Sequence, residues 1–299
     1  MVEQGSAGME GRIIKGIAGF YVVESGGNTV MCKAKGIFRK DGIKPLVGDL
    51  VKYRAAETDD SEASIEEILP RRNILIRPAV SNVDQALVVL SVRDPDPQLF
   101  LLDEYLILME QQALPAAVLW NKTDLDDGTL SGKYREVYES AGYRVLFMCT
   151  KTGEGIPELK EYLRGKTTVL AGPSGVGKSS LTNLLCPGAG METGEISRKI
   201  SRGKQTTRHT ELFPLGENTY LLDTPGFSSV YVEAEAKDLR FLFPEISGCE
   251  GECRFTGCLH LKEPDCAVKE KTSRGIIAES RYESYRKLMQ ELSERRKYR

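Results

Sequence analysis

Residues 167–179 read Thr-Thr-Val-Leu-Ala-Gly-Pro-Ser-Gly-Val-Gly-Lys-Ser, an apolar stretch that runs directly into a glycine-rich loop. The loop, Gly172–Ser179, matches the phosphate-binding pattern G-x-x-x-x-G-K-[ST]. Its glycines let backbone N–H groups turn inward around phosphate oxygens. We expect Thr167–Ala171 to be a buried strand and Lys178–Leu185 to be a helix whose positive N-terminal end faces the anion. The stretch therefore predicts a nucleotide-binding α/β domain.

The loop also assigns roles to single residues. Lys178 is expected to reach the β- and γ-phosphates and to act in catalysis, and the Ser179 hydroxyl is expected to bind magnesium. The residues predicted to surround the phosphates are Gly172, Pro173, Ser174, Gly175, Val176, Gly177, Lys178, Ser179 and Ser180. This pattern does not separate GTP from ATP, so an ATPase or a kinase is an alternative at this point.

Asn121-Lys122-Thr123-Asp124 decides between the two bases. It follows the apolar stretch Ala116–Trp120, at the end of a predicted strand where the ligand of a parallel sheet lies. The Asp124 carboxylate can accept from both the ring N–H and the exocyclic amino group of guanine. Adenine offers no such pair and would leave the carboxylate unpaired. The tetrapeptide therefore predicts guanine recognition, with Lys122 packed along the base; a helix N-cap is the alternative interpretation.

A second loop is expected to complete the base site. Cys149–Gly155 follows the predicted strand Arg144–Met148, and we expect Thr150 and Lys151 to bring a backbone N–H to the guanine O6. Taken alone, this segment resembles any polar turn.

Asp223-Thr224-Pro225-Gly226 matches D-x-x-G after the strand-like stretch Asn218–Leu222. We expect Asp223 to hold magnesium, directly or through water, and the Gly226 N–H to contact the γ-phosphate. Gly188–Leu215 is glycine-rich and basic, and Thr207, favoured over Thr206, is expected to complete the magnesium shell and to act in catalysis. An exposed loop without a switch role is the alternative for this segment.

The order of the motifs is rotated, because the guanine motif precedes the phosphate loop. A doubly wound sheet tolerates such a rotation when its original ends lie close together. The rotation predicts a circularly permuted GTPase domain over residues 73–232, in which strands alternate with helices. The strands are expected at Gln85–Val92, Ala116–Trp120, Arg144–Met148 and Thr167–Ala171, and the helices near Leu101–Gln112, near Pro157–Leu163 and from Lys178. The D-x-x-G segment then leads into the C-terminal region, and we hypothesise that it transmits the nucleotide state there.

The N-terminal region, residues 1–72, carries short strand-like segments with a hairpin signal at Ser25–Asn28. The segments are Arg12–Ile14, Phe20–Glu24, Thr29–Ala34, Asp49–Tyr53 and Ile65–Leu69. Five such strands predict an open β-barrel of the OB type, and an SH3-like barrel is the alternative.

The C-terminal region, residues 233–299, combines a cysteine cluster with a mostly helical stretch, Ser273–Arg299. Cys253-x4-Cys258-x-His260-x5-Cys266 offers three thiolates and one imidazole, a tetrahedral donor set for one structural zinc ion. Such a site couples metal binding to folding. Cys249 is a spare thiol, and reduced cysteines without a metal are the alternative.

Composition limits the other roles. The 299 residues are 40% hydrophobic and 28% charged, with a net charge of −2, so overall charge gives no support for nucleic-acid binding. Local basic groups remain at Arg71–Arg72 and at Arg295–Arg299, the latter near Tyr285 and Tyr298. The seven cysteines are odd in number and no signal peptide is present, which argues against a disulfide framework and for a cytoplasmic protein. No apolar run is long enough to span a membrane.

The motif order, the N-terminal barrel and the cysteine cluster together resemble the ribosome small-subunit-dependent GTPase A (RsgA) family, over nearly the whole chain. The resemblance implies an OB domain, a permuted GTPase domain and a zinc domain whose ligands match position by position. It also implies a role in late maturation of the small ribosomal subunit, with hydrolysis stimulated by that subunit and its rRNA. We therefore expect a monomer that binds neither DNA nor a membrane.

Two positions concern the orientation of the water molecule that attacks the γ-phosphate. Phe227 follows Gly226 where Ras-like enzymes have a glutamine, a substitution that the family shares. Gln205 stands where family members often carry a histidine, and it is a candidate for orienting the water, with His209 as the alternative. A zinc and OB RNA-binding module with a nucleotide switch but little hydrolysis is the second function considered.

Overall fold

The computed structural model describes residues 8–36, 38, 42–56, 62–76, 79–189, 210–216, 218–223 and 231–296. The chain forms two compact units, each assembled from separate stretches of sequence. The first comprises Met1–Asp84, Leu163–Leu170 and Thr182–Phe227, and the second comprises Gln85–Tyr162, Ala171–Leu181 and Ser228–Arg299.

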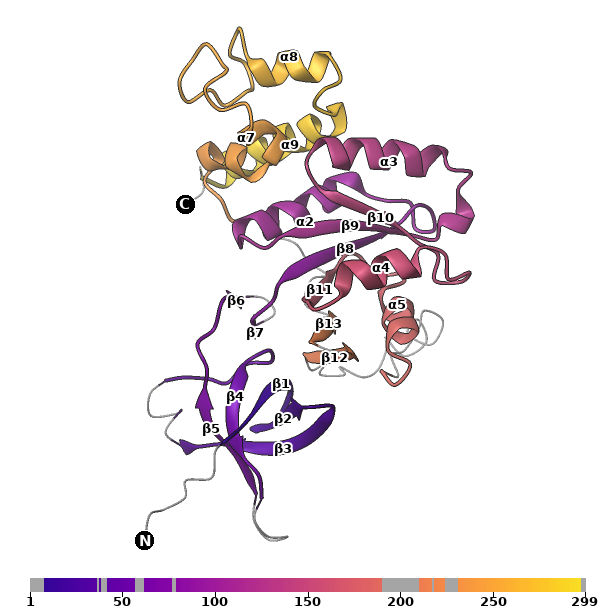
Figure 1. Cartoon of the computed structure of the whole chain (residues 1–299). Helices are drawn as coiled ribbons and strands as arrows, with labels where there is room; N and C mark the ends of the chain where they lie inside the picture. Colours follow the sequence, from indigo (N-terminus) through magenta and orange to yellow (C-terminus); the bar gives the residue numbers. More distant parts are fainter. Residues whose placement is uncertain are drawn as a thin grey trace, which may run out of the picture. The chain divides into compact units, whose positions relative to one another are not determined.

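A five-stranded barrel forms the N-terminal part of the first unit (Figure 1). Its strands are β1 (Met9–Ile17), β2 (Phe20–Ser25), β3 (Asn28–Ala34), β4 (Leu50–Arg54) and β5 (Ala63–Ile68). They follow the order β1-β2-β3-β5-β4, and β1 closes the barrel by pairing with β4. The side chains of Ile13, Val23, Cys32, Val51 and Ile65 are fully buried inside it. The predicted OB-type barrel is confirmed, and the hairpin between β2 and β3 turns at Gly26 and Gly27, both with positive φ.

Three further strands of the first unit extend the barrel sheet. β11 (Thr167–Ala171) runs parallel to β13 (Thr219–Asp223), and β13 pairs antiparallel with β12 (Glu211–Gly216). β12 in turn pairs with β1 of the barrel at Glu211 and Lys15, whose side chains form an ion pair at 2.6 Å. The same sheet therefore holds both the barrel and the strand that ends at Asp223.

β12 corrects one expectation. No strand was predicted within the glycine-rich segment Gly188–Leu215, but its last residues form a strand from Glu211 onward. Leu212 and Phe213 are buried there, and this burial stabilises pairing that local composition does not indicate. The rest of that segment from residue 190 to residue 209 lies outside the described residues.

Arg12 connects the barrel to the neighbouring strands within the first unit. Its guanidinium donates to the Thr167 hydroxyl and lies 4.6 Å from the centre of the Tyr220 ring. The Tyr220 hydroxyl donates to Glu24 on β2 at 2.7 Å. Burial lowers the pKa of Arg12, while the neighbouring acidic groups and Tyr220 oppose that change.

A short linker follows the barrel. Its two strands, β6 (Ile74–Leu75) and β7 (Val80–Ser81), pair with each other. The Asp49 carboxylate is fully buried and accepts from Arg71 through both oxygens and from the Ser81 hydroxyl. Arg72 pairs with Asp84 at 2.6 Å. Both predicted basic residues thus make ion pairs that fasten the linker to its surroundings.

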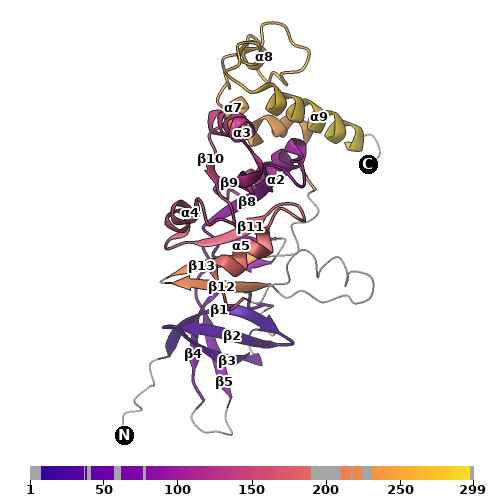
Figure 2. The ribbon, with the colours of Figure 1, turned by 90° about the vertical axis from the view of Figure 1, so that its right-hand side faces the viewer.

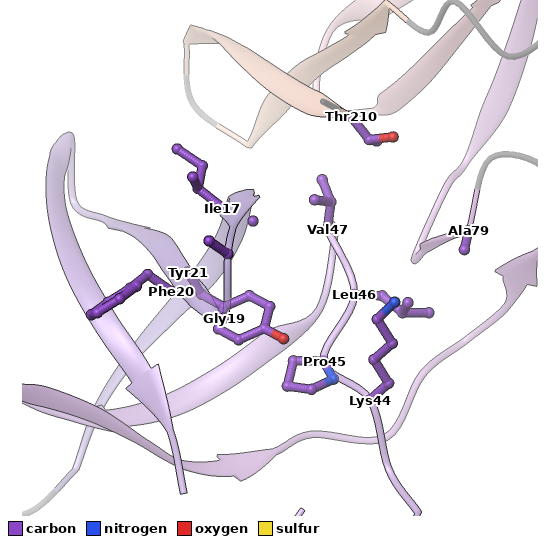
Figure 3. Close-up of a pocket in the computed structure, with 12 residues that line it drawn as sticks. Ile17, Gly19, Phe20, Tyr21, Lys44, Pro45, Leu46, Val47, Ala79 and Thr210 are labelled. Carbon is purple, nitrogen blue, oxygen red and sulfur yellow. The ribbon is translucent and has the colours of Figure 1, made fainter. Parts of the chain in front are cut away.

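A pocket of about 360 Å³ opens in the first unit beside the barrel (Figure 3). The turn around Phe20 and Tyr21, the loop Lys44–Val47 and Thr210 line it. None of the residues predicted to bind a nucleotide lies in its wall, so this pocket is separate from the predicted nucleotide site.

The second unit contains a parallel sheet with helices. β8 (Gln85–Ser91), β9 (Ala116–Asn121) and β10 (Arg144–Phe147) are parallel, in the order β10-β9-β8. Every residue of β8 is buried, as expected for a strand covered on both faces. The helices around the sheet are α2 (Leu99–Gln111), α3 (Thr129–Ser140) and α4 (Ile156–Leu163). The alternation of strands and helices predicted from the sequence is confirmed, except that α3 was not predicted because only Tyr134 and Tyr138 of this helix are buried.

The C-terminal segment completes the second unit. Its elements are η3 (Ala236–Leu242), α7 (Pro244–Ser247), α8 (Ala267–Ser273) and α9 (Glu279–Arg296), and α9 packs against α2 (Figure 2). Ile107 of α2 shares one apolar cluster with Phe243, Tyr285 and Leu288. The helix predicted over Ser273–Arg299 begins later, at Glu279, because Gly275 adopts a positive φ after α8.

None of the helices in the described part of the chain has the length and apolar character needed to cross a lipid bilayer.

Candidate functional site

The phosphate-loop sequence connects β11 to the helix α5 (Lys178–Leu185), as its pattern predicts. Its three glycines, Gly172, Gly175 and Gly177, adopt positive φ values. A Cβ atom at Gly172 would lie 2.2 Å from the Val89 carbonyl oxygen, and one at Gly177 would lie 2.3 Å from Asn121 Nδ2. The loop can take this path only with glycine at both positions, because any side chain would collide with its neighbours.

Lys178 turns back over the loop. Its Nζ donates to the carbonyl oxygens of Gly172 at 2.7 Å and Pro173 at 2.6 Å. The ammonium group therefore lies against the backbone at the start of the loop. Ser179 and Ser180 are half-buried at the first turn of α5, at the positive end of the helix.

Asn121 joins the predicted phosphate and base motifs. The side chain is 1% exposed at the end of β9. Its Nδ2 donates to the Val176 carbonyl oxygen at 2.9 Å, and its Oδ1 accepts from the Thr150 N–H at 3.2 Å. One amide thus holds the phosphate loop and the 149–155 loop on either side of the strand end.

The rest of the guanine motif turns sharply after Asn121. Lys122 adopts a left-handed conformation with φ 62°, and its Nζ donates to the Asp94 carbonyl oxygen. Thr123–Leu125 form one turn of 3-10 helix, η1, which carries Asp124. A quarter of the Asp124 side chain is exposed, so its carboxylate is open to a base.

Two neighbours approach the Asp124 carboxylate. The Cys149 thiol donates to Oδ1 at 3.1 Å, and Lys151 Nζ lies 3.7 Å from Oδ2. Thr150 and Lys151 are the residues of this loop that were predicted to face the base, and Cys149 was not among them. One feature of the sequence could have indicated a role for Cys149. It stands two residues after the end of β10, the strand that pairs with β9.

The switch residues are only partly described. Asp223, predicted to hold magnesium, is the last residue of β13. Thr206, Thr207, Gln205, His209, Gly226 and Phe227 lie outside the described residues. The hypothesis that the D-x-x-G segment transmits the nucleotide state to the C-terminal region falls on the same undescribed stretch.

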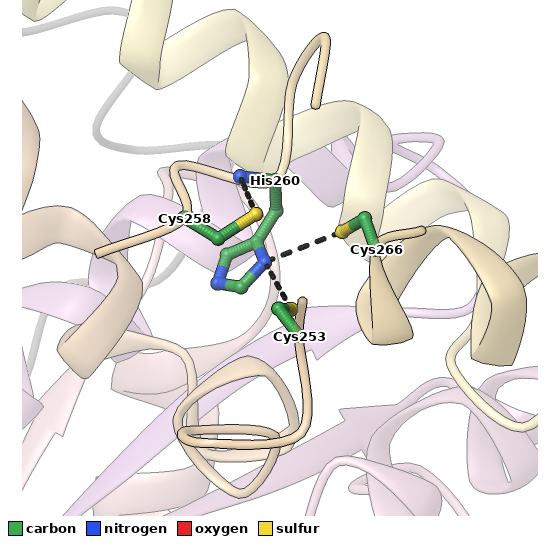
Figure 4. A group of neighbouring side chains, drawn as sticks. All are labelled: Cys253, Cys258, His260 and Cys266. Atoms are coloured by element: carbon green, nitrogen blue, oxygen red, sulfur yellow. Dashed lines mark hydrogen bonds between the residues drawn. The ribbon is translucent and has the colours of Figure 1, made fainter. Parts of the chain in front are cut away.

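The predicted zinc ligands come together in one cluster (Figure 4). Donor atoms from Cys253, Cys258, His260 and Cys266 all lie within 4.8 Å of one another. His260 Nδ1 is 3.5 Å from the Cys253 sulfur and 3.4 Å from the Cys266 sulfur. This compact set of three sulfurs and one nitrogen fits the donor number and chemistry of a tetrahedral zinc site.

Burial shifts the pKa values of two residues in the cluster in opposite directions. Burial lowers the pKa of His260, which favours the neutral imidazole that binds metals. Burial raises the pKa of Cys258 to about 12, which favours the protonated thiol in the absence of a metal ion.

The helix α9 and a glutamate hold the cluster loop in shape. The Tyr282 hydroxyl donates to the His260 carbonyl oxygen at 2.6 Å, and the Tyr285 hydroxyl donates to that of Leu259 at 2.8 Å. The Glu263 carboxylate accepts three backbone N–H groups of the loop. Cys249 stays outside the cluster, where its sulfur contacts the Glu245 carbonyl oxygen and Lys271 Nζ, each at 3.4 Å.

The N-terminal barrel region and the GTPase region each match a known family model. Residues 68–233 match the family model described as RsgA GTPase, and residues 10–65 match the RsgA N-terminal domain. The chain belongs to the RsgA GTPase family. It is therefore a GTPase, and the resemblance inferred from the sequence is confirmed.

Individual RsgA relatives match nearly end to end. The small ribosomal subunit biogenesis GTPase RsgA of Agathobacter rectalis is 51% identical, over 97% of this chain and 100% of that protein. The protein of the same name from Alkaliphilus metalliredigens is 44% identical, over 97% and 99%. YloQ, described as a circularly permuted GTPase, is 38% identical with a TM-score of 0.79, over 99% of this chain and 98% of that structure. YjeQ from Thermotoga maritima is 36% identical with a TM-score of 0.78, over 95% and 98%.

The C-terminal residues singled out with the local basic group differ in exposure. Tyr285 is fully buried and serves the cluster loop, so it is not a surface residue. Arg295 is part of α9, where it donates to the Val232 carbonyl oxygen and lies 3.7 Å from Glu291. Residues 297–299 lie outside the described part of the chain.

Proposed function

We propose that this chain hydrolyses GTP during late maturation of the small ribosomal subunit, and that the subunit and its rRNA stimulate the hydrolysis. The names of its relatives as small ribosomal subunit biogenesis GTPases support the process. The observation that carries the chemistry is the double hydrogen bonding of Asn121. It places the phosphate loop and the base loop at one strand end, although the two motifs stand in rotated order in the sequence.

The proposed nucleotide contacts follow from this placement. Asp124 reads the guanine edge, Lys122 lies along the base, and the Thr150 and Lys151 segment faces the guanine O6. The proposed contacts to GTP are Asn121, Lys122, Thr123, Asp124, Thr150, Lys151, Gly172, Pro173, Ser174, Gly175, Val176, Gly177, Lys178, Ser179, Ser180 and Gly226.

Catalysis rests on charge placed around the transferred phosphoryl group. Lys178 stabilises negative charge on the β- and γ-phosphate oxygens, and Thr207 and Gln205 are the further catalytic candidates. Ser179, Thr207 and Asp223 are proposed to hold magnesium. Bound magnesium neutralises developing charge on the phosphate oxygens.

The remaining assignments concern organisation. We assign residues 1–72 to an RNA-binding OB domain, 73–232 to the permuted GTPase domain and 233–299 to the zinc-binding domain. Cys253, Cys258, His260 and Cys266 are the proposed ligands of one structural zinc ion. The chain acts as a monomer in the cytoplasm, where ribosomes are assembled, and its partner is the small subunit with its rRNA rather than DNA or a membrane.

The zinc assignment predicts one bound ion per chain. Cys258→Ser is expected to lose most of this zinc and to lower the melting temperature, because metal binding at such a site contributes to folding. Inductively coupled plasma mass spectrometry measures the metal, and differential scanning calorimetry measures the stability. Cys249→Ser, which changes a neighbouring thiol outside the cluster, is the matched control and should keep the zinc. Equal zinc content in the two variants would refute the ligand set.

The function is tested by GTP hydrolysis with and without purified small ribosomal subunits, with ATP as the control nucleotide. We expect stimulation that is specific for GTP, and Lys178→Ala should remove both the basal and the stimulated rate. An equal rate of GTP hydrolysis with and without the subunit would leave the GTPase chemistry intact but would argue against the ribosomal role. GTP binding without turnover in either condition would instead favour an RNA-binding module with a nucleotide switch.

A further inference from the structure

Helix α3 packs directly on the strand that ends at Asn121. Trp120, the preceding residue of β9, is fully buried. Its ring stacks on that of Tyr134, with the centroids 4.1 Å apart and the planes at 11°, and it lies 6.3 Å from the ring of Tyr138. Both tyrosines belong to α3. The position of the strand end is therefore set in part by this helix.

The Tyr138 hydroxyl extends the contact to α2 and α9. It donates to Asp103 Oδ1 of α2 at 3.2 Å, and Arg281 of α9 donates to the same oxygen at 2.7 Å. All three side chains are fully buried. Burial raises the pKa of Tyr138 well above its ordinary value, so the hydroxyl keeps its proton and remains a donor. One oxygen atom of α2 thus accepts from both α3 and α9.

Helix α9 also holds the loop of the cysteine–histidine cluster. Tyr282, which follows Arg281, donates to the His260 carbonyl oxygen at 2.6 Å. His260 is one of the four proposed metal ligands. Buried side chains therefore join a proposed metal ligand to the residue that precedes Asn121, and every element between them belongs to the second unit.

These contacts leave little room for independent movement. Side chains in a close-packed interior do not absorb a displacement, so they pass it to their neighbours. A metal ion that orders the cluster loop would also order α9, α2 and α3 against β9, and a nucleotide that binds afterwards would lose less conformational entropy. Asn121 is sensitive to such ordering, because its one amide must meet both Val176 and Thr150.

We propose that zinc at the cysteine–histidine cluster and guanine nucleotide at the end of β9 bind cooperatively, and that the contacts from Arg281 through Asp103 and Tyr138 to Trp120 carry the coupling. The inference rests on the proposed zinc and nucleotide sites. Coupling between two binding sites is reciprocal, so each ligand tightens the binding of the other by the same factor. Tyr138 acts as a positioning residue, since it is not among the proposed contacts to either ligand.

Two tyrosine variants separate this route from general stability. Tyr138→Phe removes the hydroxyl that reaches Asp103 but keeps the ring beside Trp120. Tyr143→Phe is the matched control, because the buried Tyr143 also donates to a carboxylate of α2, that of Glu110, at 3.2 Å. Among the described residues, the ring contacts of Trp120 are with the two tyrosines of α3 and not with Tyr143.

The first measurement is the dissociation constant of GDP, by isothermal titration calorimetry on the full chain, with one zinc ion bound and after a chelator has removed it. We expect the zinc-loaded chain to bind GDP about tenfold more tightly than the depleted chain. Tyr143→Phe should keep this ratio, whereas in Tyr138→Phe it should fall to about twofold or less. Trp120 is the one tryptophan of the chain, so its fluorescence reports on the strand end. Zinc removal should shift its emission to longer wavelength in the unmodified chain and in Tyr143→Phe, and much less in Tyr138→Phe.

The second measurement uses only the zinc-loaded chain and so does not need a stable metal-free form. It follows the transfer of zinc to the chromophoric chelator 4-(2-pyridylazo)resorcinol, with and without GDP. GDP should slow the transfer by about the same factor as zinc tightens GDP binding, in the unmodified chain and in Tyr143→Phe but not in Tyr138→Phe.

Two results would overturn the inference: zinc transfer that GDP does not slow in the unmodified chain, or equal coupling in the two tyrosine variants. The second would mean that the sites communicate without the Tyr138 hydroxyl. Failure of the underlying function looks different, because then the unmodified chain would bind no zinc or would not prefer GDP over ADP.

Discussion

Replacing Asp124 by asparagine is expected to weaken GTP binding on the order of a thousandfold and to improve binding of xanthosine triphosphate. Guanine presents two N–H donors, and a carboxylate answers them with two acceptor oxygens. An amide has one acceptor and one donor, so its N–H would face an N–H of guanine. Xanthine carries a carbonyl oxygen in place of the amino group, and this oxygen accepts from the new amide.

Competition binding with GTP, XTP and ATP measures this change in preference. Asp127→Asn provides the control, since it is the same substitution three residues away on an exposed side chain whose acceptor oxygen bonds the Thr129 N–H. An asparagine oxygen can accept that bond equally well, so we expect no change in nucleotide preference. If Asp124→Asn still selects GTP over XTP, Asp124 does not read the base.

Arg281 is the second position where a single change has a large expected effect. Its side chain is fully buried, and it donates to Asp103 Oδ1 at 2.7 Å and to both oxygens of Glu245 at 2.7 and 3.2 Å. The Tyr138 hydroxyl donates to the same Asp103 oxygen at 3.2 Å. Burial by itself lowers the pKa of Arg281, but the two carboxylates outweigh it and raise the pKa well above its ordinary value. One guanidinium thus joins α9 to α2, to α7 and, through Asp103, to α3.

Arg281→Met is expected to destabilise the second unit by about 3–5 kcal/mol, because two buried carboxylates would lose their counter-ion. For a cooperative unit of this size, such a loss corresponds to roughly 10 °C in melting temperature, measured by calorimetry. The triple variant Arg281→Met, Asp103→Leu and Glu245→Met should recover most of the loss, since replacing a whole buried ion set by apolar residues is often neutral.

Arg274→Met is the matched control for the arginine substitution. Arg274 lies 3.5 Å from Glu270 on the surface, with 64% of its side chain exposed, so its removal should cost less than about 0.5 kcal/mol. Equal melting temperatures for Arg281→Met and Arg274→Met would show that the buried ion set does not hold the C-terminal helix to the GTPase fold.

Local chemistry explains which parts of the site could be predicted from the sequence. The phosphate loop, the guanine motif and the four residues of the cysteine–histidine cluster each lie within about 15 residues, and each needs particular residue types at short spacings. Their conformations follow from those residues: Gly172 and Gly177 take backbone angles and close approaches that side chains forbid. The rotated order of the motifs was also visible without a structure, and it predicted the permuted fold.

Elements without a strong pattern of their own were not predicted. β12 follows a basic, glycine-rich segment and becomes a strand because β13 and β1 offer it hydrogen-bonding edges. The helix α3 is mostly polar, and its two buried tyrosines pack against Trp120 of β9. In both elements, stability comes from pairing or packing with neighbouring elements rather than from a pattern within the element itself.

The sequence by itself determined the class of chemistry: a guanine nucleotide, a phosphate loop, an OB-type barrel and a cluster of three cysteines and one histidine. Only the tertiary structure decided how single side chains cooperate. It placed the Cys149 thiol on Asp124 across 25 residues and Arg281 on Asp103 across 178 residues, and it turned Tyr285 inward to the loop of the cysteine–histidine cluster. Such contacts have no local signature, because a hydrogen bond depends on distance and direction in space and not on separation along the chain.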